Sequence, residues 1–399
     1  MEVSTLNTSC RNHASPALGS RRLGPWLGGV LVLCLVHVPF SSVTAKGAGS
    51  VWAWGSGASG VLGDRVVGDR DVPVRVSGLH DVTAIAAGQD SAYALLHNGT
   101  VVAWGSGASG ALGNGKRADR DVPVRVSGLH DVTAIAAGQD SGYALLHNGT
   151  VMAWGSGASG ALGDGKTADS DVPVRVSRLR NVVAITAGYY AAYALARNGT
   201  EVAWGDGIFG ALGDGKTADS DKPVRVSSLQ DVVAITAGED VAYALLRDGT
   251  VRAWGIGIFG ALGDGSVMSS SVPVRVKDLA TVRAVAAGAV AAYALLSNGT
   301  VAAWGSGGEG QLGNGTIVTS DQPVLVRGIS GVRAICAGGE SAYALLASGS
   351  AVAWGGNSYG QLGHHDLRDH DIPVPVDGLR QVTAIASGDY SVFAMTRGG

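Results

Sequence analysis

The chain has 399 residues, of which 63 are glycine and only 15% are charged. Glycine reaches more than twice its usual share of about 7%, which is typical of many short strands joined by tight turns. The formal net charge is −3 at pH 7 and no run of Lys or Arg occurs. We therefore expect no nucleic-acid partner, because phosphate binding needs a basic surface.

Residues 1–45 have the pattern of a secretory signal peptide. Arg21 and Arg22 precede the apolar stretch 23–38, and small residues follow up to Ala45. The stretch is shorter than the roughly 20 residues that a membrane span needs. We expect cleavage after Ala45, a short linker at 46–50, and a secreted or cell-surface protein. The alternative is a segment retained as a signal anchor, and only then would the protein be held at a membrane.

Cysteine use excludes a disulfide in the rest of the chain. Cys10 and Cys34 lie in the leader, and Cys336 is the single cysteine of residues 46–399. Cys336 stands in the apolar run RAICAG, where most other repeats have Ala. We expect it to be a small buried apolar residue.

Residues 51–399 consist of seven consecutive copies of one 50-residue unit, of which the first is Val51 to Thr100 and the last is one residue short. A constant period of about 50 residues with strand-like content indicates a radial or stacked repeat architecture. We interpret the seven copies as one domain.

Each repeat predicts four short strands. In the second copy the expected strands are 123–126, 132–137, 142–146 and 150–154. Asn148-Gly149 predicts a two-residue type I′ hairpin, because both residues tolerate positive φ. The strands are interpreted as one blade in this order, with a glycine-rich connection leading to the next blade. The fold class is therefore all-β, a seven-bladed β-propeller with four antiparallel strands per blade.

Several positions recur in every repeat and suggest how the blades pack. One Trp per repeat, beginning with Trp54, is expected to be an apolar anchor beside the connection that follows it. Leu62 and its counterparts are expected to fill the space between blades. Gly60, Gly63 and Gly88 indicate positive φ or close backbone approach.

The two ends of the repeat region predict how the ring closes. The first repeat begins with a strand at 51–54 that lacks a preceding hairpin, and the last repeat ends after a strand at 392–395. We expect these two strands to pair and close the ring, which would remove exposed sheet edges.

The recurring run V-x-A-W-G, G-Q-L-G, P-V and Y-A-L resembles the regulator of chromosome condensation repeat, and the resemblance covers residues 51–399. The seventh copy matches best, with Trp354-Gly355, Asn357 and 359–363. The family's fold is a seven-bladed propeller. Its founding nuclear member is a guanine-nucleotide exchange factor, whereas secreted bacterial members include protein-binding inhibitors such as a β-lactamase inhibitor protein. The leader makes the secreted members the closer likeness.

The chain departs from the family pattern at several positions. The His that usually opens the third strand is replaced by Ser, Ala or Val in all seven copies, for example by Ser91. No repeat carries an inserted loop. For these reasons no exchange-factor residue is carried over to this chain.

Strand direction predicts which loops share a face of the ring. Residues 188–191 and 205–220 should lie on one face, and the turns at 128–131 and 148–149 on the other. The repeats differ mostly on the first face, where large apolar residues cluster in the third, fourth and fifth repeats. The candidate partner-binding residues are Tyr189, Tyr190, Ile208, Phe209, Ile256, Ile258 and Phe259. The alternative is that Ile and Phe fold inward and only fill space.

No motif supports an enzyme, and we expect no cofactor. The run 364–371 of the last repeat contains His364, His365 and His370 beside carboxylates, which are weak candidates for a transition-metal site. A solvated polar loop is the simpler interpretation.

These observations predict an exported, monomeric, non-catalytic protein-interaction scaffold that binds a protein partner through one face. A secreted enzyme inhibitor is the first alternative. An exchange factor or chromatin-type regulator is the second, and it would require nuclear or cytoplasmic residence.

Overall fold

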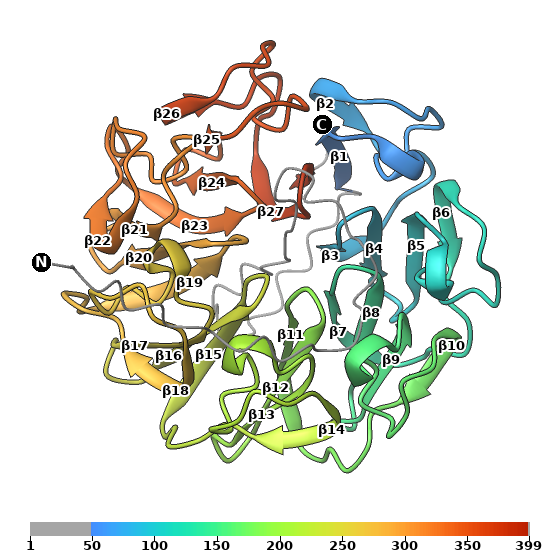
Figure 1. The fold of residues 1–399 in the computed structure, drawn as a ribbon. Helices are drawn as coiled ribbons and strands as arrows, with labels where there is room; N and C mark the ends of the chain where they lie inside the picture. Colours follow the sequence, from blue (N-terminus) through green and yellow to red (C-terminus); the bar gives the residue numbers. More distant parts are fainter. Residues whose placement is uncertain (1–48, 398–399) are drawn as a thin grey trace, which may run out of the picture.

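The computed structural model describes residues 49–397, which form a ring of seven blades around a central axis (Figure 1). Each blade is a four-stranded antiparallel sheet, so the expected all-β seven-bladed propeller is confirmed. The predicted signal peptide and its cleavage site lie outside the described residues, and the first strand already begins at Ser50, within the expected linker. Among residues 49–397, no helix has the length and apolar character needed to cross a membrane.

Four concentric layers of strands build the ring. The innermost strands are β3 (Val82–Ala87), β7 (Val132–Ala137), β11 (Val182–Ala187), β15 (Val232–Ala237), β19 (Val282–Ala287), β23 (Val332–Ala337) and β27 (Val382–Ser387). The second layer is β4 (Ser91–Leu96), β8 (Ser141–Leu146), β12 (Ala191–Ala196), β16 (Val241–Leu246), β20 (Ala291–Leu296), β24 (Ser341–Leu346) and β28 (Ser391–Thr396). The third layer is β1 (Ser50–Gly55), β5 (Val101–Gly105), β9 (Val151–Gly155), β13 (Glu201–Gly205), β17 (Val251–Gly255), β21 (Val301–Gly305) and β25 (Ala351–Gly355). The outer layer is β2 (Arg70–Arg75), β6 (Arg120–Arg125), β10 (Ser170–Arg175), β14 (Ser220–Arg225), β18 (Ser270–Arg275), β22 (Ser320–Leu325) and β26 (His370–Pro375).

Short 3-10 turns open five of the connections between third and outer strands. They are η1 (Ala58–Gly60), η2 (Ala108–Gly110), η3 (Ala158–Gly160), η4 (Ile208–Gly210) and η5 (Ile258–Gly260). Each packs on the next blade along the chain; η4, for example, lies against β17 and β18.

The blade boundaries differ from the sequence-based prediction. The strand containing Pro123 was expected to be the first strand of the blade that continues with 132–137. Instead β6 pairs with β5 and is the outer strand of the preceding blade, while β7 starts the next blade at the axis. The glycine-rich connection therefore lies within a blade, and the short turn at 128–131 crosses between blades.

The expected closure of the ring is confirmed. β1 pairs with β28 in an antiparallel register that includes Val51 opposite Met395 and Trp54 opposite Val392. The last blade therefore contains β27 and β28 from the end of the chain and β1 and β2 from its start, and Figure 1 shows the dark blue β1 close to the red β27. No edge remains open between the first and last repeats.

The hairpins are not of the expected type I′, because φ is positive at Gly149 but not at Asn148. The N–H of Gly149 donates to the carbonyl oxygen of Leu146, and the N–H of Leu146 donates to that of Thr150. This is a three-residue loop ending in a left-handed glycine. The Asn148 side chain accepts a hydrogen bond from the N–H of Thr150 at 2.9 Å, which explains the recurrent Asn.

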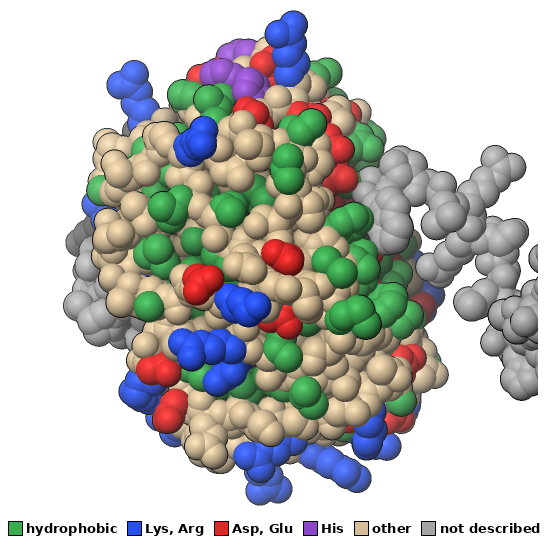
Figure 2. Space-filling view, turned by 60° about the vertical axis from the view of Figure 1, so that its left-hand side comes forward, with side chains coloured by type: hydrophobic (Ala, Val, Ile, Leu, Met, Phe, Trp, Pro, Cys, Tyr) green, Lys and Arg blue, Asp and Glu red, His purple; other side chains and the backbone are tan. Residues whose placement is uncertain are grey.

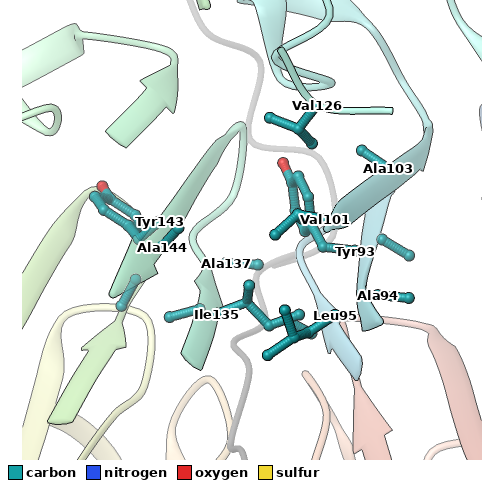
Figure 3. Packing of buried hydrophobic residues seen from close by; sticks show 14 of the residues in the cluster. Tyr93, Ala94, Leu95, Val101, Ala103, Val126, Ile135, Ala137, Tyr143 and Ala144 are labelled. Atoms are coloured by element: carbon teal, nitrogen blue, oxygen red, sulfur yellow. The ribbon is translucent and has the colours of Figure 1, made fainter. Parts of the chain in front are cut away.

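Neighbouring blades are held together by a repeated clasp of Tyr, Trp and a carbonyl group. The carbonyl oxygen of Ala111 accepts hydrogen bonds from the Tyr93 hydroxyl at 2.7 Å and from Trp154 Nε1 at 2.9 Å. The two rings meet edge to face with centroids 5.7 Å apart. Small buried residues such as Ala94 and Ala137 let neighbouring sheets approach each other closely (Figure 3).

The Trp residues are buried, but not beside the connection that follows them. Trp154 bonds to the connection of the preceding blade, 43 residues back in the chain, and a side chain at Gly113 would collide with its ring. Leu62 and its counterparts are fully buried, and Cys336 is 1% exposed, as expected. Gly60 and Gly63 have positive φ, and a side chain at Gly88 would meet the carbonyl oxygen of Gly138.

Candidate binding face of the propeller

The loop face of the ring consists of the loops between innermost and second strands and the starts of the connections that follow third strands. These two sets of segments are joined, because the N–H of Asp206 donates to the carbonyl oxygen of Tyr190 at 3.1 Å. The opposite hairpin face joins the crossing turns to the hairpins, as in the bond from the His147 N–H to the Asp131 carbonyl oxygen. The predicted grouping of loops is therefore found. The later part of each connection runs away from the loop face: Gly213 accepts a bond from Ser227, which follows the outer strand.

An apolar patch lies where η4 and η5 open the connections of two adjacent blades. Ile208, Phe209 and Phe259 are 46%, 41% and 43% exposed, and Ile258 is half-buried. These four residues are here called the Ile-Phe patch. Figure 2 shows that exposed apolar side chains also occur singly elsewhere on the molecule. The patch differs from those because the same Ile-Phe pair is presented twice by neighbouring elements.

The backbone at both phenylalanines is unusual. Phe209 and Phe259 each have φ of 56°, in the left-handed region that bulky residues avoid. The equivalent residue in the earlier blades is Ser, for example Ser109 with φ of 53°. The turn geometry thus belongs to the repeat, and Phe occupies it without being buried. A strained backbone conformation costs free energy, and residues whose burial does not offset that cost are characteristic of functional positions.

Ile256 does not belong to the exposed patch, contrary to the sequence-based expectation. It is 6% exposed and packs in the core with Val251 and Leu262. For this residue the alternative of inward packing is the correct one. It directly follows the third strand, and its N–H is tied to the carbonyl oxygen of Asp240 at 2.8 Å, so its side chain is held close to the blade.

Tyr189 lies at the axis rather than in the Ile-Phe patch, and Tyr190 packs against it. Their rings are edge to face with centroids 4.6 Å apart, and both residues are half-buried. The Tyr189 hydroxyl donates to Gln89 Oε1, which comes from two blades away, at 3.4 Å. The predicted partner-binding set is therefore divided between a more peripheral patch and an axial pair.

Sequence reasoning missed the acidic residues around the axis on the loop face, here called the axial acidic cluster. Its members are Asp90, Asp140, Glu239, Asp240, Glu340 and Asp389. Burial raises the pKa of Asp240 and of Glu340 to about 7, and nearby carboxylates add to both shifts. The signal in the sequence was the recurrence of Asp or Glu at two successive positions of the aligned repeats.

The histidines of the last connection are only partly brought together. The rings of His364 and His370 have centroids 5.7 Å apart, and His370 Nε2 lies 3.2 Å from Asp366 Oδ2. His365 is exposed. Within residues 49–397, no group of three or more His, Cys, Asp or Glu side chains is arranged to hold a metal ion.

Comparison with solved structures agrees with the fold. Human WBSCR16 is 22% identical with a TM-score of 0.79, over 88% of this chain and 99% of the other. Prp20p from Saccharomyces cerevisiae, described with its binding properties to Gsp1p and histones, is 21% identical with a TM-score of 0.77, over 89% and 93%. Yeast RCC1 (Prp20) bound to Kap60 is 20% identical with a TM-score of 0.77, over 98% and 97%. A search of the curated proteins finds no significant match.

The fold and its clasped repeats define a closed seven-bladed propeller of the RCC1 type. Residues 39–289 match the RCC1-like domain, and residues 298–345 and 348–395 match the regulator of chromosome condensation (RCC1) repeat. The chain belongs to this family.

Proposed function

We propose that this protein is an exported, non-catalytic scaffold that binds a protein partner through the loop face of its propeller. The observation that carries the proposal is the Ile-Phe patch, in which Phe209 and Phe259 are exposed although their backbone is strained. Exposed aromatic side chains on a rigid element are typical of anchors that enter a partner's pocket. Structural relatives support a protein partner, because yeast Prp20p is described as binding Gsp1p and histones.

The test is affinity capture with the full chain as bait against the secreted and surface proteins of the source organism. The variant Phe209→Ser with Phe259→Ser carries the residue found at the equivalent positions in earlier blades, so its turns should fold as Ser109 and Ser159 do. We expect a protein that the native chain retains and the variant loses. Direct titration of that protein should show affinity lowered about tenfold or more.

Met268→Ser is the matched control. Met268 is 71% exposed and belongs to the same connection as Phe259, but not to the patch. It should leave capture unchanged. If Met268→Ser loses the captured protein to the same extent, or if the double Phe variant retains it fully, the patch is not the docking site.

Export is a separate part of the proposal and rests on the pattern of residues 1–45. Sequencing the N-terminus of the native protein tests it, with Lys46 expected as the first residue. A cytosolic chain that retains Met1 would favour the exchange-factor alternative. If the captured partner is an enzyme, its activity with and without the propeller distinguishes an inhibitor from a passive scaffold.

A further inference from the structure

The loops at the loop-face end of the axis are joined by a series of backbone hydrogen bonds that runs from blade to blade, from Gln89 to Asp389. The N–H of Gln89 donates to the carbonyl oxygen of Gln139, Gln139 to Tyr189, and Tyr189 to Glu239, at 3.1–3.3 Å. Side chains from this repeat position also meet: Gln139 Nε2 donates to Gln89 Oε1, and the Tyr189 hydroxyl donates to the same atom. This position of the repeat therefore directs its side chains to the axis.

In the last blade this position is Asp389, which is 0% exposed. Neither of its carboxylate oxygens has a hydrogen-bond partner within residues 49–397. The charged groups that act on it come from four other blades and are all carboxyls, namely Asp90, Asp140, Glu239 and Glu340. Asp389 is therefore aimed into the axial acidic cluster.

A buried carboxyl without a donor is costly, and buried charges in proteins are normally paired. The unused acceptor atoms at the axis thus point to a cationic group with several N–H donors. The four surrounding carboxyl residues are half-buried, so solvent and ligands can reach them. Because no three of these side chains have a metal-holding arrangement, an organic cation fits better than a metal ion. Guanidinium and ammonium groups have the required donors.

We propose that the loop-face end of the axis, centred on Asp389, is a binding site for an Arg or Lys side chain in a basic segment of the partner protein. The inference rests on the proposed function, since it describes the chemistry of a partner docked on the same face. The partner would then attach at two points, with a cationic side chain at the axis and with a contact to the apolar Ile-Phe patch.

The site should respond to pH. Burial, and then the carboxyls of Asp90, Glu239, Asp140 and Glu340, raise the pKa of Asp389 well above its usual range, and burial raises the pKa of Glu340 to about 7. A cation binds the ionised carboxyls, so its affinity should rise between pH 5.5 and pH 8 as protons leave. Asp389→Asn should reduce this pH dependence, whereas a merely structural role for Asp389 would leave it unchanged.

The experiment titrates a fluorescent hexa-arginine peptide, blocked at both ends, with the full-length protein at about 0.1 M salt. Anisotropy reports binding, which should strengthen with pH. Asp389→Asn should weaken binding about tenfold or more at pH 8. The control Asp171→Asn removes the same charge from the outer strand β10 and should change affinity less than about twofold. Asp240→Asn, at a half-buried member of the cluster, gives a second test if Asp389→Asn misfolds.

Equal weakening by Asp171→Asn would overturn the inference, because it would indicate attraction by overall charge alone. Absence of peptide binding, or binding that neither cluster variant weakens, would also overturn it. So would binding of Ca²⁺ or Mg²⁺ alone, measured by calorimetry, that depends on Asp389 and excludes the peptide.

The two proposals can fail separately. Phe209→Ser with Phe259→Ser should lose the captured partner but bind the peptide as the native chain does. If peptide binding depends on Asp389 but the double Phe variant still captures the partner, the axial site is supported and the patch assignment is wrong. If capture depends on the patch but the cluster variants bind the peptide normally, the patch is supported and the axial site is wrong.

Discussion

At the scale of single residues, the exceptions to the repeat are the informative positions. Six blades have a Tyr in the second strand, and its hydroxyl closes the clasp with the neighbouring Trp. The last blade has Phe393, which packs on Trp104 with centroids 5.8 Å apart but offers no hydroxyl. The carbonyl oxygen of Val61 is therefore bonded only to Trp104 Nε1 in that clasp.

Phe393→Tyr should complete the seventh clasp. The added hydroxyl can donate to the Val61 carbonyl oxygen, as the Tyr343 hydroxyl does to that of Gln361 at 2.9 Å. We expect the free energy of unfolding to rise by about 1 kcal/mol, the usual net value of a buried hydrogen bond. Chemical denaturation measures it, and Tyr343→Phe should give a loss of similar size. A destabilised Phe393→Tyr would mean that the last blade is packed differently from the others.

Glu201 is a second exception, because it occupies a buried position where five other repeats have Val. It is 2% exposed, and neither carboxylate oxygen has a hydrogen-bond partner in the described chain. Burial raises the pKa of Glu201 well above its usual range. The group is therefore a cost to stability at neutral pH.

Glu201→Val should raise the free energy of unfolding by about 2 kcal/mol at pH 7. The sign of the pH dependence follows from the raised pKa of Glu201. Below the unfolded pKa of 4.5 both states hold the proton, and above it only the folded state does, so the native chain loses stability as pH rises. The advantage of the variant should grow from pH 5 to pH 8. Glu201→Gln, which cannot ionise, should remove that pH dependence; a constant difference across the range would contradict this account.

At the scale of elements, the periodic sequence predicted the strands well and their partners less well. The expected strand at 132–137 has the same bounds as β7, because small apolar residues end at a glycine there. The assignment of the strand at 123–126 to the following blade was wrong. Chain order cannot tell whether an outer strand continues the sheet behind it or starts the sheet ahead, since both choices keep four strands per repeat.

The element that closes the ring should be essential to stability. A chain that begins at Gly55 lacks most of β1. The strands β28 and β2, which both pair with β1, then have no strand between them. We expect the melting temperature of this chain to be lower, by on the order of 10 °C or more, than that of a chain that begins at Gly49 and keeps β1. Differential scanning calorimetry of the two truncations measures it. Equal melting temperatures would show that the ring does not depend on this strand pair.

At the scale of the whole molecule, seven-fold repetition gathers residues that are 50 positions apart. Gln89 and Gln139 become neighbours at the axis, and Asp389 from the end of the chain joins carboxyls from four other blades. Part of the candidate site could be predicted: the Ile-Phe patch follows from differences between aligned repeats. The axial acidic cluster was missed, because each acidic residue alone resembles a solvated loop residue and only their recurrence at two positions of the aligned repeats sets them apart.

The sequence by itself determined the number of blades, the strands and the closure of the ring, because these follow from a strict period and from incomplete repeats at the two ends. The tertiary structure decided which strand completes which sheet, that each Trp reaches back to the preceding connection, and that Ile256 turns inward while Phe209 does not. The physical reason is that hydrophobic period and turn chemistry act within one repeat. Contacts between blades depend instead on the rotation between successive repeats, which no single repeat encodes.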